Sequence, residues 1–177
     1  MGIKNLNSFL EKHAKLAITE QNLSRYKNKK VAIDTSIFLY KFKYSGKFLE
    51  SFVNQVYHFS RFDITPIYVF DGAPPKEKQD VLDSRKEHKQ KILQKVEELE
   101  EEINKLTIDQ EDLRKELEIQ IKQTQRKCIN ITREDVDNLK KVFNIMGVKY
   151  IQANCEADLV CCKLFKNGEV DTCLSND

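Results

Sequence analysis

Four short segments rich in β-branched and aromatic residues recur along this chain. They occupy residues 30–34, 66–72, 148–151 and 170–174. Segments of this length and composition are typical of buried β-strands. The pattern therefore predicts four strands that are spread over the whole sequence.

Apolar residues with helical spacing fill the intervals between these strands. One set steps by four, four and three residues: Phe48, Phe52, Val56 and Phe59. A second set follows the N-cap candidate Thr132: Val136, Leu139, Val142 and Phe143. We expect a third helix that begins at Cys155, is capped by Asn154 and ends before Gly168. Strands that alternate with helices predict an α/β fold with a mostly parallel central sheet.

Residues 76–146 contain neither glycine nor proline, which predicts that this stretch is mainly helical. Its apolar residues have a heptad-like spacing: Ile92, Val96, Leu99, Ile103 and Leu106, continued by Leu113 and Leu117. Thr107 offers a turn and a new helix cap. We therefore expect a helical arm over residues 76–131 within a single domain of residues 1–177. Three forms stay open: a hairpin of two helices, one long helix, and a coiled coil between two copies.

The composition fits one globular domain, because 40% of the 177 residues are hydrophobic and 33% are charged. The net charge is only +2, so any basic surface must be local. The five cysteines include no Cys-x-x-Cys pair, which favours free thiols in a reducing compartment over disulfides or a zinc site. No apolar run approaches the roughly 18 residues of a membrane span, and the first residues lack a signal-peptide core. We expect an intracellular protein that is neither secreted nor membrane-bound.

Carboxylates follow the predicted strands where the strands end. Asp34, Asp71 and Asp177 each come directly after the carboxyl end of a strand. Glu156 and Asp158 fall in the first turn of a helix that follows another strand. Because the carboxyl ends of parallel strands face one common edge, where ligands bind, all five acids could converge there.

Five converging carboxylates would repel one another unless cations offset their charge, and hard divalent ions prefer oxygen ligands. The pattern therefore favours Mg²⁺, or Mn²⁺ in its place, over zinc. Two such ions roughly 4 Å apart are an arrangement for phosphodiester hydrolysis. Each acid taken singly has an ordinary alternative role as a turn or cap residue. Residues two apart on a helix point about 200° apart, so Glu156 and Asp158 can share ions only if one lies at a frayed first turn.

Basic residues follow Asp71 closely: Lys76, Lys78, Arg85, Lys86, Lys89 and Lys91. Lys78 and Arg85 are two helical turns apart and would share a face that could hold phosphates, unless that face is simply solvated. Tyr40 lies six residues after Asp34 on a predicted short helix. Its ring could stack on a base or fill the core beside Ile37.

In these motifs the sequence resembles the flap endonuclease family of structure-specific 5′ nucleases. The matching segments are residues 1–6 (MGIKNL), 31–36 (VAIDTS) with Tyr40, 69–76 (VFDGAPPK), 146–153 (MGVKYIQA), 156–158 (EAD) and 175–177 (SND). Their order and approximate spacing agree with the family from residue 1 to residue 177, except in the helical arm, which is somewhat longer here.

The resemblance implies a PIN-like α/β nuclease domain whose helical arm is an arch for a single-stranded 5′ end. It implies metal ligation by Asp34, Asp71, Glu156, Asp158 and Asp177, with Asp158 where the family usually has Glu. It assigns Lys78 and Arg85 to the reacting phosphate and Tyr40 to stacking near the scissile position. It also places Gly2 and Lys47 at the DNA, and we expect further DNA contacts from Lys76, Lys86 and Lys89.

Some features of the family are missing from these residues. They are a further Asp two positions past Asp177, the helix-hairpin-helix segment that binds duplex DNA, and a sliding-clamp motif. We therefore expect either a fragment of a longer enzyme or a truncated relative.

The expected function is hydrolysis of DNA at 5′ flaps or single-strand/duplex junctions, in replication or repair, with two Mg²⁺ ions as cofactors. We expect a monomer in the nucleus or another DNA-containing compartment. The alternative is a non-catalytic relative that binds DNA or protein through its helical arm.

Overall fold

The structure is a computed structural model that describes residues 5–73, 79–106, 110–125 and 128–175. The chain divides into two compact units. The first comprises Met1–Ala73 and Arg133–Asp177, and the second comprises Pro74–Thr132. Gly2, Lys76, Lys78 and Asp177, to which the sequence assigns roles, lie outside the described residues.

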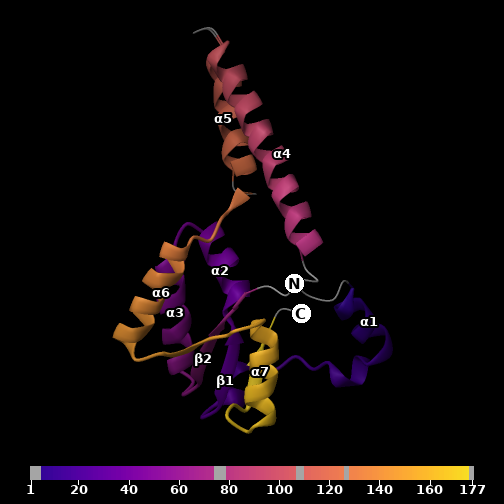
Figure 1. Cartoon of the computed structure of the whole chain (residues 1–177), viewed down its shortest axis with the longest axis vertical. Coiled ribbons are helices and arrows are strands. Elements are labelled where there is room, and N and C mark those ends of the chain that lie inside the picture. Colours follow the sequence, from indigo (N-terminus) through magenta and orange to yellow (C-terminus); the bar gives the residue numbers. More distant parts are fainter. Residues whose placement is uncertain (1–4, 74–78, 107–109, 126–127, 176–177) are drawn as a thin grey trace. The chain divides into compact units, whose positions relative to one another are not determined.

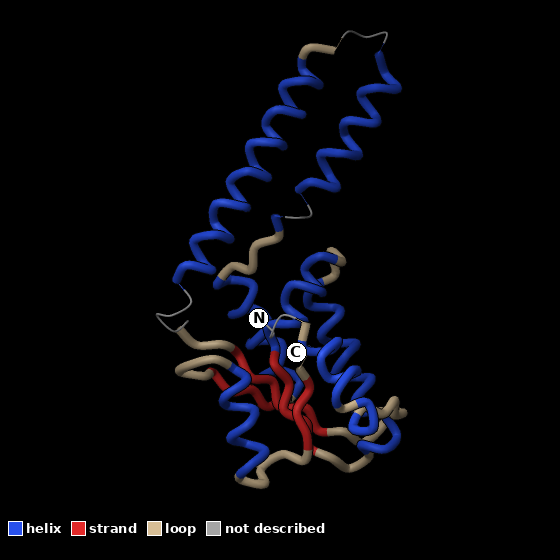
Figure 2. Tube along the Cα trace, turned by 90° about the vertical axis from the view of Figure 1, so that its right-hand side faces the viewer, coloured by secondary structure: helices blue, strands red, loops and turns tan. Residues whose placement is uncertain are grey.

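The first unit is built on a sheet of four parallel strands, drawn in red in Figure 2. The strands are β1 (Lys30–Asp34), β2 (Thr65–Phe70), β3 (Lys149–Gln152) and β4 (Thr172–Leu174), in the order β3-β2-β1-β4. In register, Asp34 at the end of β1 faces Val69 of β2, and Ile33 faces Leu174 of β4. The predicted α/β fold with a parallel sheet is confirmed.

Helices cover both faces of this sheet (Figures 1 and 2). In chain order they are α1 (Leu6–His13), the 3₁₀ turns η1 (Lys15–Ala17) and η2 (Leu23–Tyr26), α2 (Thr35–Tyr44), α3 (Phe48–Ser60), α6 (Arg133–Met146) and α7 (Ala157–Lys166). The helices predicted from apolar spacing are α3, α6 and α7. The predicted start of the third was wrong, because α7 begins at Ala157 with Glu156 as its N-cap, not at Cys155 with Asn154. Residues 153–155 instead hydrogen-bond to residues 70–72.

Aromatic side chains form the core on one face of the sheet. The ring of Phe143 on α6 stacks on Tyr68 of β2 at 4.4 Å and meets Phe52 of α3 edge-on at 5.8 Å. All three side chains are fully buried. The hydroxyl of Tyr68 donates to the Gln55 side chain at 2.8 Å, so its polar end is satisfied. This layer fixes α3 and α6 against β2.

Smaller side chains form the core on the opposite face, beneath α7. Because side chains alternate along a strand, Ile67 and Val69 of β2 point away from the aromatic layer. They pack with Ala157, Cys161 and Leu164 of α7. The alanine and cysteine let the first turns of α7 approach the sheet closely, which brings the start of this helix to the carboxyl edge of β2.

The second unit contains a helical hairpin, so the open choice between one helix and two is resolved. Its helices are α4 (Gln79–Asn104) and α5 (Glu111–Gln125). Val96 and Leu99 of α4 are buried against Leu117 and Ile121 of α5. α4 is charged along its length, and within the described ranges no helix combines the length and apolar character needed to cross a membrane.

The predicted seam of the arm is right for α4 and partly wrong for α5. Leu113 is 43% exposed, whereas Ile121, which the spacing did not single out, is buried. Residues four apart advance about 40° beyond a full helical turn. Leu113 and Ile121 are therefore about 80° apart around the helix. The buried stripe is centred on Leu117 and Ile121.

Asp171 ties the segment before β4 to the start of β1. Its carboxylate accepts hydrogen bonds from the Lys30 amide at 2.8 Å and from the Lys29 ammonium at 2.9 Å. Its own amide donates to the Lys30 carbonyl at 2.9 Å. The hydrogen bond from Lys29, followed by that from Lys30, lowers the pKa of Asp171 below its usual value. The carboxylate therefore holds the short edge strand in place while it is ionised.

We predict that Asp171→Asn lowers the stability of the first unit at neutral pH. Because the folded-state pKa of Asp171 is lowered, its contribution is complete above the unfolded-state pKa and is lost as pH falls through the folded-state value. The difference between the two proteins in urea unfolding should therefore be largest near pH 7 and vanish in acid. Asp137→Asn, an exposed carboxylate on α6, is the control, and an equal effect from it would contradict the assignment.

Candidate metal centre

Asp34 is the buried carboxylate at the end of β1. It is only 8% exposed, and it caps α2 by accepting a hydrogen bond from the Ser36 amide at 2.9 Å. Burial is the main cause that raises its pKa above the ordinary value, and the hydrogen bond from Ser36 opposes this. The charges of Asp71 and Asp158 raise the pKa further. Asp34 therefore lies within electrostatic reach of two other predicted ligands.

Asp71 lies just past β2 and is held by two other segments. One carboxylate oxygen accepts a hydrogen bond from the Ala157 amide, at the start of α7, at 2.8 Å. The other accepts from the hydroxyl of Ser36 on α2. Ser36 thus contacts both Asp34, through its amide, and Asp71, through its side chain. A free amide at a helix N-terminus is a favourable partner for a carboxylate.

Glu156 and Asp158 flank the amide that contacts Asp71. Glu156 is the N-cap of α7 and has extended backbone angles, φ −69° and ψ 141°, whereas Asp158 lies in the first helical turn. The two acids are therefore not both within the regular helix. This meets the condition under which residues two apart can serve one site.

Three of the five predicted ligands interact electrostatically in the structure. That all five form one metal centre stays a prediction. Asp34 interacts with Asp71 and Asp158. Among the described residues, no three His, Cys, Asp or Glu side chains are arranged so that they could hold a metal ion. Ser175, the last described residue, follows β4 directly after Leu174, which lies opposite Ile33.

Two further residues position Asp71, and the sequence did not point to them. The amide of Gln152, at the end of β3, donates to the Asp71 carbonyl at 2.7 Å. The ammonium of Lys140 on α6 donates to the other side-chain atom of Gln152, its oxygen, at 2.8 Å. Lys140 also lies 5.1 Å from the ring centre of Phe70. This chain of contacts holds the backbone at Asp71, as Ser36 and Ala157 hold its side chain.

Gly72 is required by a close approach of two loops. Its amide donates to the Cys155 carbonyl at 2.7 Å. A Cβ atom at this position would lie 2.4 Å from the Ala153 carbonyl oxygen and 2.5 Å from the carbonyl carbon of Asn154. Since these are backbone atoms, they cannot turn aside as a side chain could. The glycine therefore lets the segments after β2 and β3 meet beside the carboxylates.

The predicted DNA-contacting side chains that the structure describes are largely exposed. Tyr40 on α2 is 55% exposed, so it is not a core residue; Leu39 beside it is buried instead. Lys47, just before α3, pairs loosely with Glu50 at 3.6 Å. On α4, the Lys86 ammonium pairs with Asp83 at 3.0 Å, and the Lys89 carbonyl accepts from the Cys128 thiol at 3.7 Å. For Arg85 only the helical backbone of α4 is described.

Comparison with known families is decisive for the first half of the chain. Residues 1–92, just over half of its length, match the model described as the XPG N-terminal domain. The chain belongs to the flap endonuclease family of 5′ nucleases. Nucleases of this family generally use divalent metal ions. The family accounts for acids at the ends of β1 and β2.

Individual flap endonucleases and their structures are similar over nearly the whole chain. Flap endonuclease 1 of Xiphophorus maculatus is 32% identical, over 100% of this chain and 47% of the relative. The structure of flap endonuclease-1 from Methanococcus jannaschii shares 27% identity with a TM-score of 0.56, over 90% of this chain and 51% of that one. The catalytic core of Rad2, at 19% identity, has a TM-score of 0.68 over 99% and 47% of the two chains. The chain spans about half the length of the curated relatives it matches.

The described acids have the ligand chemistry that a hard divalent ion prefers, without forming a three-ligand cluster among the described residues. The side chains that converge at this edge of the sheet offer carboxylate oxygens, the ligands that Mg²⁺ prefers. The charges of Asp71 and Asp158 also disfavour ionisation of Asp34, and a cation would remove this penalty. The donor set and its mutual repulsion thus agree with the metal use of the flap endonuclease family.

We predict that Gly72→Ala disturbs this centre. The added methyl must displace backbone at Ala153 and Asn154, so we expect a loss of about 1–3 kcal/mol in the free energy of unfolding. Denaturant unfolding measures it. Gly46→Ala is the comparison, because that glycine has φ 75° but no atom within 4 Å of a Cβ, so strain acts there without a clash. A smaller loss for Gly72→Ala than for Gly46→Ala would refute the close-approach argument.

Proposed function

We propose that this chain carries the nuclease centre of a divalent-metal-dependent 5′ nuclease that hydrolyses DNA at 5′ flaps or single-strand/duplex junctions. The observation that carries the proposal is that Ser36 hydrogen-bonds to both Asp34 and Asp71, while Asp71 also accepts from the Ala157 amide between Glu156 and Asp158. Membership of the flap endonuclease family supports the reaction. The structure of the Rad2 core, solved in complex with a DNA substrate, supports the class of substrate.

The metal part of the proposal names the ion, its number and its ligands. Mg²⁺ is the ion, with Mn²⁺ as a substitute, and two ions are held by Asp34, Asp71, Glu156, Asp158 and Asp177. When bound, such ions offset the negative charge on the reacting phosphate and lower the pKa of water toward neutrality. The chain's own residues keep the carboxylates in place. Ser36 and the Ala157 amide donate hydrogen bonds to Asp71, and the Asp34 side chain is buried.

The DNA-binding part of the proposal uses exposed aromatic and basic side chains. The Tyr40 ring, more than half exposed, is available to stack on a base near the scissile phosphate. Lys78 and Arg85 contact that phosphate, and further contacts come from Gly2, Lys47, Lys76, Lys86 and Lys89. The enzyme acts as a monomer in the nucleus or another DNA-containing compartment.

The packing of the helical hairpin argues against the alternative of a non-catalytic interaction protein. That alternative uses the apolar seam of the arm to recruit a partner or a second copy. Val96 and Leu99 are already buried against Leu117 and Ile121 of the same chain. The central side chains of that seam are therefore occupied within the hairpin, whereas Leu113 stays exposed.

We predict that Asp71→Asn abolishes cleavage while leaving the fold intact. The amide keeps an oxygen that can accept from Ala157, but it removes the negative charge that a divalent ion requires. In an assay with Mg²⁺ and a labelled 5′-flap duplex, kcat should fall about 100-fold or more. Binding of the same DNA, measured by fluorescence anisotropy in Ca²⁺, should stay close to that of the unsubstituted protein.

Two controls make the result specific. Asp137→Asn on α6 removes an exposed carboxylate and should leave kcat unchanged. Chelation with EDTA should stop cleavage, and Mg²⁺ should restore it. Full activity of Asp71→Asn would refute the proposed centre, and faster cleavage of an RNA flap would reassign the substrate.

We predict that Gln152→Glu raises the Mg²⁺ concentration that cleavage requires, because it removes the hydrogen bond that positions the Asp71 backbone. Glutamate keeps an acceptor for Lys140 but replaces the donor that lies 2.7 Å from the Asp71 carbonyl with a repelling oxygen. The Mg²⁺ concentration for half-maximal cleavage should rise about 10-fold or more. Asn144→Asp on α6, an exposed amide-to-acid change, should not shift it. An unchanged Mg²⁺ requirement in Gln152→Glu would show that Gln152 does not position Asp71.

A further inference from the structure

Three thiols from two separate segments lie together beside the carboxylate edge. Cys161 and Cys162 are on α7, and Cys173 is the central residue of the edge strand β4. The Cys173 thiol donates to the Cys161 carbonyl at 3.3 Å, so its sulfur touches the backbone of α7 at the peptide bond that precedes Cys162. The thiols are free in the structure.

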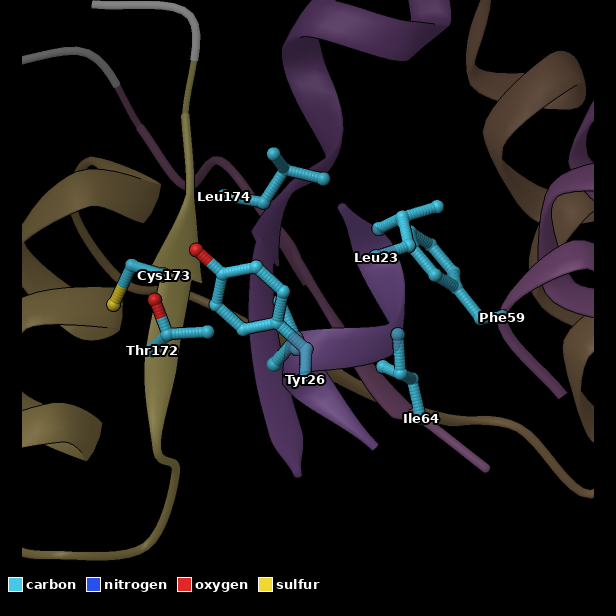
Figure 3. Close-up of a pocket in the computed structure, with 8 residues that line it drawn as sticks. Leu23, Tyr26, Phe59, Ile64, Thr172, Cys173 and Leu174 are labelled. Atoms are coloured by element: carbon cyan, nitrogen blue, oxygen red, sulfur yellow. The ribbon is translucent and has the colours of Figure 1, made fainter. Parts of the chain in front are cut away.

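The side-chain direction of Cys173 follows from the alternation of β4. Thr172 and Leu174 line a pocket with Leu23 and Tyr26 on one face of the sheet, and Cys173 between them also borders it. In Figure 3 the sulfur of Cys173 points away from the side chains of that pocket, toward α7. Ala32, opposite Cys173 in β1, packs beneath the same helix. Cys173 therefore faces the helix that carries the other two thiols.

The flank of α7 that faces Cys173 carries Cys162. Asp158 and Cys162 are four residues apart and so lie on the same side of the helix. The Cys173 sulfur lies 3.3 Å from the carbonyl oxygen of the peptide bond that leads into Cys162, so Cys162 is next to this contact. Burial, followed by the charges of Cys162 and Asp158, raises the pKa of Cys173. Cys162 and Cys173 are also solvent-exposed, so a small oxidant can reach them.

We propose that Cys162 and Cys173 are a site of reversible oxidation, at which a peroxide joins α7 to β4 through a disulfide. The Cys162 thiol releases its proton, and its thiolate sulfur attacks the peroxide; the O–O bond breaks to give a sulfenic acid and hydroxide, which takes up the released proton as water. The thiolate of Cys173 then attacks that sulfur and displaces hydroxide, which takes up a proton as water. Two thiols are oxidised, one hydrogen peroxide is reduced to two waters, and a thiol reductant reverses the step.

Cys161 is not the partner of Cys173, although it is adjacent in sequence. It is only 4% exposed and packs in the core beneath α7. The core around its sulfur denies peroxide access, whereas Cys162 and Cys173 are exposed. Because reaction with peroxide needs an accessible thiolate, Cys162 is the thiol of α7 that reacts first.

The test is a disulfide map of the full chain. The reduced protein is treated with hydrogen peroxide, its remaining thiols are alkylated, and it is digested with trypsin and a Glu/Asp-specific protease for mass spectrometry. We expect a cross-link between the peptides of Cys162 and Cys173, lighter than the two peptides together by two hydrogen atoms. Dithiothreitol should remove it, and a non-reducing gel should show a monomer.

Single substitutions decide which thiols are joined. Cys162→Ser and Cys173→Ser must lose the cross-link, whereas Cys161→Ala and the exposed control Cys155→Ser must keep it. Fragment ions from the unsubstituted protein distinguish Cys161 from Cys162 even if Cys161→Ala does not fold.

Three results would overturn the proposal. They are a cross-link that survives Cys162→Ser, a cross-link from Cys173 to Cys161 or Cys155, and complete alkylation of Cys173 under conditions that oxidise Cys155. The map needs no nuclease assay, so its outcome does not depend on the proposed function.

Discussion

The carboxylate of Asp71 joins three segments that are far apart in the chain. It follows β2, and it accepts hydrogen bonds from the first amide of α7 and from the hydroxyl of Ser36 on α2. Each contact satisfies a polar group at the carboxyl edge of the sheet, where strand ends and helix starts leave such groups unpaired. Gln152 adds a fourth contact through the Asp71 backbone. Together with the packing of Ala157, Cys161 and Leu164 on the sheet, the contact with the Ala157 amide positions the start of α7 and hence Glu156 and Asp158.

The elements of the fold could be predicted because local patterns encode them. Apolar runs gave the four strands, and apolar spacing gave α3, α6 and the two helices of the hairpin. The start of α7 was misplaced because Asn154 is an ordinary cap residue by sequence. Only the long-range hydrogen bonds between residues 153–155 and residues 70–72 show that this stretch is a loop and not the start of a helix. Strand order, β3-β2-β1-β4, is likewise a property of the assembled sheet.

The acids of the candidate centre could be predicted because the carboxyl ends of parallel strands lie at one edge of the sheet. Acids that follow different strands therefore come close together. Asp34 and Asp71 follow strands that pair in register, so their proximity is a consequence of topology. Ser36, Gln152 and Lys140 could not be found in this way. Their roles depend on contacts across 35, 81 and 12 residues. Ser36 and Gln152 lie in segments that match the family, but those segments assign them no contact. The one available signal was the position of Ser36, two residues after Asp34, where its amide can bond to the capping carboxylate. That signal does not predict the second contact of Ser36, from its hydroxyl to Asp71.

The hairpin formed by α4 and α5 closes its apolar seam with its own residues, among those that the structure describes. Its antiparallel helices can therefore gain or lose opposed turns in matched pairs, each addition burying its own new side chains. The strands of the sheet and their register would be untouched by such a change. The arm could therefore differ in length between related proteins without any change in the sheet that carries the carboxylates.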